Sequence, residues 1–121
     1  MEALESVRGA FCPQYHHAVE LIGRRWTGAI VRALLNGVTR FSVLAETIPG
    51  MSDRMLSERL KELEAEGIVE RIVIPETPVR IEYRLTERGL ALAGVVEAIG
   101  NWAQTWVPLS DASSQTAPAA R

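Results

Sequence analysis

The sequence predicts a mostly helical α+β fold in which two short helices meet at a tight turn and lead into a two-stranded hairpin. Three patterns in the 121 residues support this prediction: apolar residues at helical spacing on both sides of a Pro-Gly pair, alternating apolar and polar residues after them, and an apolar stripe near the C-terminal end. A chain of this length can bury one core but not two. We expect one domain over residues 1–109 and, because residues 110–121 are small and polar, a disordered tail.

The first helical pattern covers residues 39–48 and places Phe41, Leu44 and Ile48 on one face. The Pro49-Gly50 pair cannot continue this helix, because proline lacks an N–H and disfavours the α conformation in the residue before it. We therefore expect a sharp turn between this helix and the next.

The second helical pattern begins after Ser52, a good N-cap, and ends before Gly67, which can adopt a left-handed C-cap conformation. Its apolar seam consists of Leu56, Leu60 and Leu63. Two amphipathic helices separated by about three residues form a helix-turn-helix, a motif whose second helix reads DNA. DNA binding is therefore the leading hypothesis.

A hairpin pattern follows the second helix directly. Residues 68–74 are rich in β-branched side chains, and residues 79–85 alternate between apolar and charged ones. Between them, residues 75–78 contain two prolines, each of which would remove a donor from a continuing strand. The predicted fold is therefore a winged helix-turn-helix with a two-stranded wing.

The terminal segments predict a dimer interface. We expect a last helix from Glu87 to Val107, N-capped by Thr86; at about 20 residues and roughly 30 Å it would overhang so small a core. An N-terminal helix is expected over residues 13–22. Large aromatic side chains contribute much of the free energy of interfaces. The alternative is that the apolar stripe of this last helix packs on the chain's own core. The predicted interface residues are Phe11, Tyr15, Val19, Val95, Ile99, Trp102 and Trp106.

A series of motifs runs in order through residues 12–106. It includes Cys12-Pro13, Ile22-Gly23-x-x-Trp26-Thr27, Arg40-Phe41-x-x-Leu44, Met55-Leu56-Ser57-Glu58-Arg59-Leu60 and Pro75-x-x-Pro78-x-Arg80-Ile81-Glu82-Tyr83. In these motifs the chain resembles the HxlR-type regulators, small bacterial winged-helix transcription factors. The resemblance implies a homodimer built by the terminal helices, and an N-terminal cysteine implicated in sensing oxidants or electrophiles such as quinones and aldehydes.

Composition excludes several classes of protein. No apolar run is long enough to span a membrane, and one cysteine rules out an intrachain disulfide framework, so we expect a cytoplasmic protein. The sequence lacks a Gly-rich phosphate loop, paired catalytic carboxylates and a metal-ligand cluster. We therefore expect neither an enzyme nor a cofactor.

The charge balance does not favour DNA binding by itself. The formal net charge is −2, whereas nucleic-acid-binding domains are often basic. DNA binding therefore requires that basic groups gather on one face, with Glu62, Glu64 and Glu66 toward the far end of the second helix. The alternative function is a winged helix used as a protein-interaction module.

The exposed face of the second helix supplies the first DNA-binding candidates. Arg54, Ser57 and Lys61 lie opposite or beside the leucine seam within its first turns, together with Glu58 and the N-cap residue Ser52. Arginine and lysine suit contacts with guanine or phosphate. The alternative is a solvated helix face on which Glu58 pairs with Lys61.

Other arginines extend this candidate site. Arg40, in the first turn of the preceding helix, is a candidate phosphate contact. Arg59 lies nearer the buried side and would anchor a phosphate or clamp the wing. Arg80, just after the wing turn, would enter a minor groove or contact phosphate, or else protect the strand edge. The remaining hairpin arginines are expected to pair across the strands, Arg71 with Glu82 and Arg84 with Glu70.

Cys12 is the candidate sensor. Because Pro13 favours the first helical position, Cys12 would be the N-cap, where the helix dipole favours the reactive thiolate. His16 would face it and help to hold the thiolate. The alternative is a small apolar residue packed at the interface. Cys12, His16 and Glu20 share a face, but zinc sites normally use more ligands, so we expect no metal.

Together these observations predict a homodimeric transcriptional regulator that binds a pseudo-palindromic operator in double-stranded DNA. The helix at residues 52–66 would lie in the major groove, with the hairpin tip near Pro78 and Arg80 against the backbone or minor groove. Repression by occlusion is expected, because the sequence carries no separate activation domain. The expected partners are DNA, a second copy of the chain and a small oxidant or electrophile, but no membrane.

Overall fold

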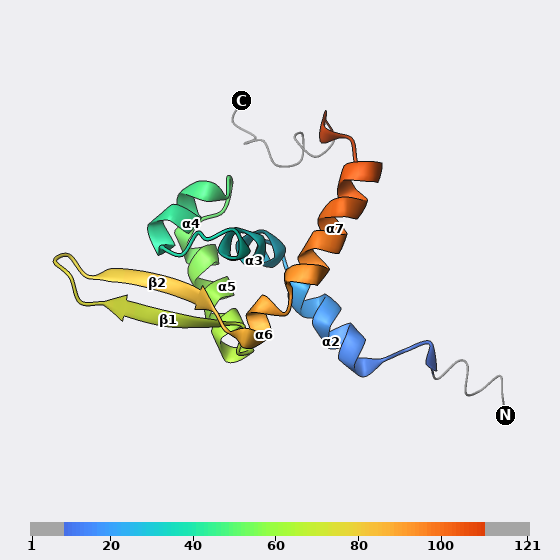
Figure 1. Cartoon of the computed structure of the whole chain (residues 1–121), viewed down its shortest axis with the longest axis horizontal. Helices are drawn as coiled ribbons and strands as arrows, with labels where there is room; N and C mark the ends of the chain where they lie inside the picture. The colour runs from blue at the N-terminus through green and yellow to red at the C-terminus, as the bar shows by residue number, and fades with distance from the viewer. Residues whose placement is uncertain (1–8, 111–121) are drawn as a thin grey trace.

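The computed structural model describes residues 9–110, which form a group of helices from which a single hairpin projects (Figure 1). The elements in chain order are α2 (Pro13–Ile22), α3 (Thr27–Leu35), α4 (Phe41–Thr47), α5 (Asp53–Ala65), β1 (Val69–Ile74), β2 (Arg80–Leu85), α6 (Glu87–Leu90) and α7 (Ala93–Trp106). The predicted mostly helical fold with a two-stranded antiparallel wing is confirmed. The tail expected to be disordered lies, from residue 111 onward, outside the described residues.

Helix α3 lies at the centre of the core, where it contacts α2, α4, β2 and α7. Its side chains Ile30 and Val31 are fully buried. Around it pack Leu44 from α4 and the leucine seam of α5, which is fully buried as predicted. Burial of this apolar surface fixes the angle between α4 and α5 and so presents the opposite face of α5 outward.

The ends of α5 follow the predicted local signals. The Ser52 hydroxyl accepts a hydrogen bond from the Met55 N–H at 3.1 Å, which satisfies a donor that the first helical turn leaves free. At the other end Gly67 has φ of +76°, a left-handed conformation that a side chain would disfavour. The chain then turns directly into β1.

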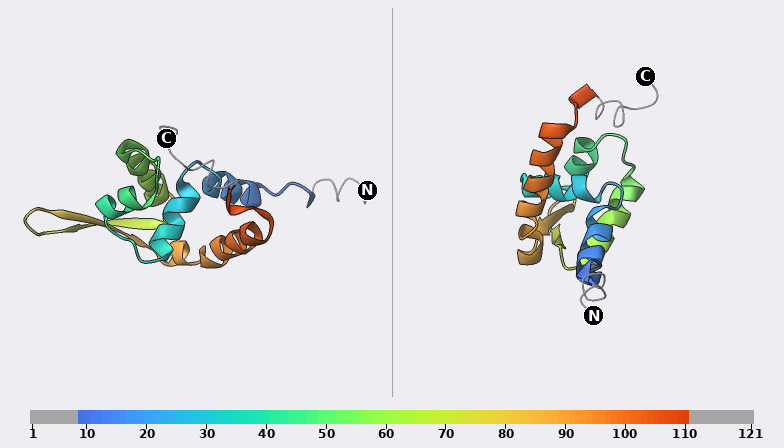
Figure 2. Two further views of the ribbon diagram at one scale, coloured as in Figure 1. Left: turned by 90° about the horizontal axis from the view of Figure 1, so that it is seen from above. Right: turned by 90° about the vertical axis from the view of Figure 1, so that its right-hand side faces the viewer.

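The hairpin pairs β1 and β2 in a register that places Arg71 opposite Tyr83 and Ile72 opposite Glu82. The segment before α4 joins the free edge of β2, because the Tyr83 N–H donates to the Thr39 carbonyl at 2.8 Å. This contact fixes the start of α4 against the wing. Figure 2 shows the hairpin projecting away from the end of the molecule that carries α2 and α7.

The last helix is not continuous, so the prediction of one helix from Glu87 to Val107 is wrong. Thr86 caps α6 as expected, accepting from the Gly89 N–H at 3.1 Å, but α6 ends after one turn. A Cβ at Gly89 would clash with the Ile68 carbonyl oxygen, which shows how closely α6 packs on the base of the hairpin. The Leu92 N–H then bonds to the Gly89 carbonyl at 3.0 Å, a tighter i+3 turn that redirects the chain into α7.

Helices α2 and α7 contribute no fully buried residue. Their apolar side chains are instead exposed, and Trp102 and Trp106 have 61% and 70% of their surface accessible. Across residues 9–110, none of the helices is long and apolar enough to cross a membrane.

Candidate DNA-binding surface

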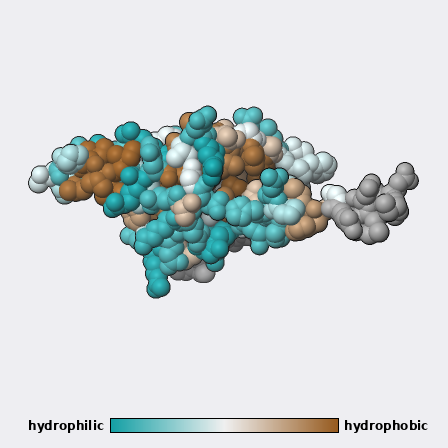
Figure 3. Space-filling view, turned by 90° about the horizontal axis from the view of Figure 1, so that it is seen from below, coloured by the Kyte–Doolittle hydropathy of each residue, from teal (hydrophilic) through white to brown (hydrophobic). Residues whose placement is uncertain are grey.

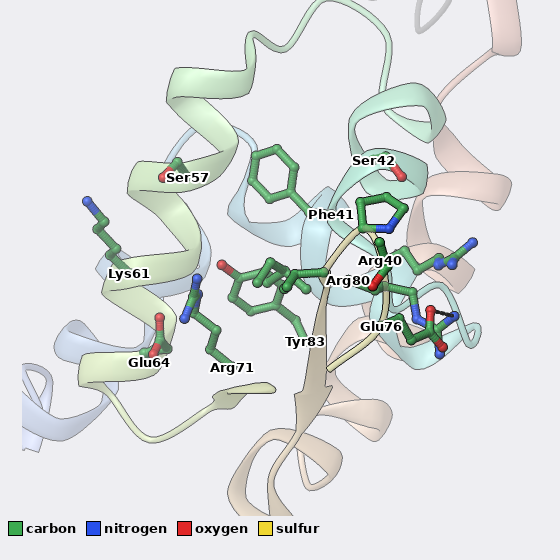
Figure 4. Close-up of a pocket in the computed structure, with 14 residues that line it drawn as sticks. Arg40, Phe41, Ser42, Ser57, Lys61, Glu64, Arg71, Glu76, Arg80 and Tyr83 are labelled. Atoms are coloured by element: carbon green, nitrogen blue, oxygen red, sulfur yellow. Dashed lines mark hydrogen bonds and ion pairs between the residues drawn. The ribbon is translucent and has the colours of Figure 1, made fainter. Parts of the chain in front are cut away.

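An open hollow of about 750 Å³ lies between α5 and the hairpin (Figure 4). Ser57, Lys61 and Glu64 line it from α5, and the start of α4 borders it on another side. The hairpin supplies the remaining wall, which is partly apolar and includes Tyr83 and Ile81. The hollow is therefore bounded by the two elements that the sequence predicted to contact DNA.

The predicted DNA-binding residues, apart from Arg59, divide into two groups. Arg40, Ser57, Lys61 and Arg80 line the hollow. Ser52, Arg54 and Glu58 lie at the N-terminal part of α5, outside the lining but exposed on the same helix. Arg59 belongs to neither group.

Arg59 is largely buried and has a structural role, so it is not part of the exposed face of α5. Its side chain is only 10% accessible and its guanidinium lies 3.1 Å from Glu62. The Nε–H donates to the Arg25 carbonyl oxygen at 2.9 Å. Arg59 therefore ties the loop between α2 and α3 to α5 and neither clamps the wing nor faces outward.

The exposed face of α5 carries a different ion pair from the expected one. Glu58 pairs with Arg54, whose Nε lies 3.1 Å from the carboxylate, and not with Lys61. The Arg54 side chain is 88% exposed, so this i, i+4 pair is weak and easily exchanged for another partner. Lys61 is left to face the hollow.

Two acidic residues of α5 are directed away from the hollow. Glu62 lies 3.2 Å from Arg24 and also pairs with Arg59, and Glu66 lies 3.1 Å from the imidazole of His17. Both carboxylates therefore point toward α2 and the loop that follows it. The separation of charge that DNA binding requires is only partial, because Glu64 lines the hollow and Glu58 is exposed on the same helix.

Arg80 is held within the wing. Its guanidinium lies 3.2 Å from Glu76 in the turn and 2.9 Å from Glu82 on the same strand. The side chain is 29% exposed. The two carboxylates therefore compete with any outside anion for this guanidinium.

Arg71 does not pair with Glu82 as predicted. Residues 71 and 82 are one register position apart, so their side chains lie on opposite faces of the hairpin. Arg71 shares a face with Tyr83 and lines the hollow, whereas Arg84 lies opposite Glu70 but places its guanidinium 3.7 Å from Glu82. The alternation along residues 79–85 gives Tyr83 a face, and the register of the hairpin then places Arg71 on the same face.

Arg40 is the N-cap residue of α4 and not part of its first turn, because the helix begins at Phe41 and not at residue 39 as predicted. Its backbone forms a bridge to Glu82 on the edge of β2, and its side chain lines the hollow.

Figure 3 shows that the hairpin end of the molecule also carries an apolar patch, and the exposed apolar residues there include Val73 and Val79.

Cys12 occupies the predicted N-cap position of α2. Its Sγ accepts a hydrogen bond from the Tyr15 N–H at 3.5 Å, and the residue is exposed. His16 instead packs against Phe11, with ring centroids 5.4 Å apart, and lies 4.0 Å from Glu20. The thiol is therefore accessible at a helix N-terminus, and the His16 ring is engaged by other neighbours.

Comparison with known proteins decides the family. The model of the HxlR-like helix-turn-helix family matches residues 21–111. The chain belongs to the HxlR family. It is 54% identical over 96 residues to the HTH-type transcriptional regulator YvaP of Bacillus subtilis, covering 79% of this chain and 89% of YvaP. It is 48% identical over 100 residues to the HTH-type transcriptional regulator YodB of the same organism, covering 83% of this chain and 89% of YodB.

Solved structures agree with this assignment. The reduced form of YodB from B. subtilis superposes with a TM-score of 0.71 at 48% identity, covering 80% of this chain and 95% of that one. The redox regulator HypR in its reduced form gives a TM-score of 0.74 at 31% identity, covering 82% of this chain and 98% of HypR. This HxlR-family chain is therefore a transcriptional regulator of the winged-helix type, and its relatives are regulators and not enzymes.

Proposed function

We propose that this HxlR-family protein binds double-stranded DNA sequence-specifically as a homodimer. The observation that carries the proposal is the shared hollow: the exposed face of α5 and the hairpin border one open surface that Arg40, Lys61 and Arg71 line with positive charge. A helix such as α5 fits the major groove, and the hairpin would then follow the backbone or the adjacent minor groove.

The homodimer is proposed from the other end of the molecule. Tyr15 on α2 and Ile99, Trp102 and Trp106 on α7 are exposed apolar residues, and exposed surfaces of this kind are commonly covered by a partner. A second copy of the chain would cover them by two-fold symmetry. Two copies of α5 about 34 Å apart would then read two half-sites of a pseudo-palindromic operator.

Repression is the proposed outcome of this binding. A dimer bound on one face of an operator occupies space that a polymerase needs to reach the promoter. The protein would act in the cytoplasm, where an operator is accessible.

Cys12 is the proposed regulatory residue. YodB has been solved in reduced, diamide-treated and quinone-bound forms, and HypR in oxidised and reduced forms. Cys12 is exposed at the N-terminus of α2, so a small reagent can reach its thiol. We propose that an oxidant or electrophile modifies Cys12 and lowers operator affinity.

Mapping of chromosomal sites bound by the protein, with and without electrophile stress, supplies the operator for a direct test. Affinity for the recovered duplex is then measured over a range of salt concentrations. We expect a steep loss of affinity with salt, because phosphate contacts release counterions from DNA. A protein-interaction module without specific DNA binding would enrich no sequence, and that result would contradict the proposal.

A further inference from the structure

Arginines near the proposed DNA-binding surface are mostly committed to carboxylates. Arg54 pairs with Glu58, Arg80 with Glu76 and Glu82, and Arg84 with Glu82. Among residues 9–110, however, no carboxylate lies within ion-pairing distance of Lys61 or Arg71. These two cations are therefore free to bind an anion from outside the chain.

Lys61 and Arg71 reach the hollow from different elements. Lys61 projects from the exposed face of α5, and Arg71 projects from β1 on the face that also carries Tyr83. Figure 4 shows the Arg71 guanidinium directed toward α5, near the hydroxyl end of Tyr83, with Lys61 on the outer side of the helix. Buried Tyr83 and the strand pairing hold the backbone of Arg71 in place.

We propose that Lys61 and Arg71 together bind one phosphate of the DNA backbone and so set the depth at which α5 enters the groove. The inference rests on the proposed function and assigns a role to Arg71 that differs from cross-strand pairing. The planar guanidinium binds phosphate through two parallel hydrogen bonds, and the ammonium adds a compact second charge. Ser57, on the same wall, carries a hydroxyl that can donate a further bond.

Arg71 lies on the wing side of the hollow, whereas Arg54 lies at the N-terminal end of α5. A side chain on the wing side of the hollow would contact the DNA backbone beside the groove before it could reach the edge of a base. Its contribution to affinity should therefore be the same for every DNA sequence. Glu64 lines the same hollow, so its carboxylate should weaken phosphate binding.

The test uses fluorescence anisotropy on the full chain with two duplexes, the mapped operator and a scrambled sequence of equal length. The variants are Arg71→Gln, Lys61→Gln and Glu64→Gln. Arg84→Gln is the matched control, because it removes the same charge from the same hairpin on the opposite face. Circular dichroism melts of each variant establish that the fold is retained.

We expect Arg71→Gln and Lys61→Gln to weaken binding to both duplexes by the same factor. Each should also reduce the salt slope by about 0.9 per lost contact, or roughly twice that for a dimer. Arg84→Gln should leave the slope near the wild-type value, and Glu64→Gln should strengthen binding to both duplexes.

Several outcomes would overturn the inference. An Arg71→Gln variant that behaves as Arg84→Gln does would show that Arg71 contacts no phosphate. A loss confined to the operator would show that Arg71 reads a base. Wild-type protein that binds neither duplex would refute the proposed function itself, and the phosphate site with it.

Discussion

The imidazole of His17 in α2 lies 3.1 Å from both carboxylate oxygens of Glu66 at the C-terminal end of α5. Arg24 and Glu62 form a second link nearby at 3.2 Å, and Arg59 supplies a third to the Arg25 carbonyl. These polar contacts join the helix that Cys12 caps to the helix proposed to read DNA. A displacement of α2 would therefore be transmitted to α5 through the contacts of His17, Arg24 and Arg59.

The first prediction concerns this connection. His17→Ala should cost less than about 1 kcal/mol of stability, because the His17 side chain is 67% exposed and surface ion pairs are screened by solvent. It should nevertheless reduce the change in operator affinity that follows Cys12 modification. Urea unfolding and anisotropy before and after diamide treatment measure the two effects. A full response to diamide in His17→Ala would exclude His17 from the connection.

Arg59 should affect folding more than binding. Arg59→Ala removes a part-buried, charged hydrogen bond to the Arg25 carbonyl and should cost about 1.5–3 kcal/mol of stability. Urea unfolding of the variant gives this value. An unchanged midpoint combined with lost DNA binding would instead support the earlier hypothesis of a phosphate contact.

Arg54 should affect binding more than folding. Arg54→Ala should weaken operator binding by about 1–3 kcal/mol if Arg54 contacts a base edge, and should alter the preferred sequence at that position. Its exposed ion pair with Glu58 contributes little to stability. Anisotropy with operators substituted at single positions measures the effect. Wild-type affinity would remove Arg54 from the site.

Substitution of both Trp102 and Trp106 by Asp should break the dimer, because both side chains are exposed on α7 and a charged pair there would be buried in the interface. Val79→Asp is the control, since it adds charge to an exposed apolar residue on the hairpin. Light scattering reports the mass of each. An unaltered dimer after the double substitution would place the interface elsewhere.

Cys12→Ser should bind the operator normally, because serine is also a good N-cap for α2. It should no longer lose affinity when treated with diamide, a quinone or an aldehyde. Mass spectrometry establishes that the wild-type thiol is modified under the same conditions. Wild-type protein that is modified at Cys12 yet keeps its affinity would show that Cys12 is only a packing residue.

Local signals in the sequence predicted the helix-turn-helix well. Ser52 and Gly67 mark the two ends of α5 as expected, and the leucine seam between them is buried. Helix α3 was not assigned, although Thr27, Ile30, Val31 and Leu34 follow helical spacing and are buried. Arg32 is exposed on the other side of this helix, so the sequence did carry a signal for it.

The remaining differences depend on tertiary contacts. The break between α6 and α7 follows from the close approach of Gly89 to Ile68, which are far apart in sequence. The partners of Arg59 and Arg80 likewise depend on where loops and strands pack. The face of Arg71 likewise depends on the hairpin register, because only residues 79–85 alternate in the sequence and β1 does not.

The most direct test of the central claim places a DNA-cleaving reagent at the start of α5. Asp53→Cys in a Cys12→Ser background carries the reagent at an exposed position, and Glu97→Cys on α7 in the same background is the control. With the mapped operator, we expect the Asp53 derivative to cut in two clusters whose centres are about 10 base pairs apart, one for each half-site. Cleavage no different from that of the Glu97 derivative, or a single cluster, would contradict a dimer that reads DNA with α5.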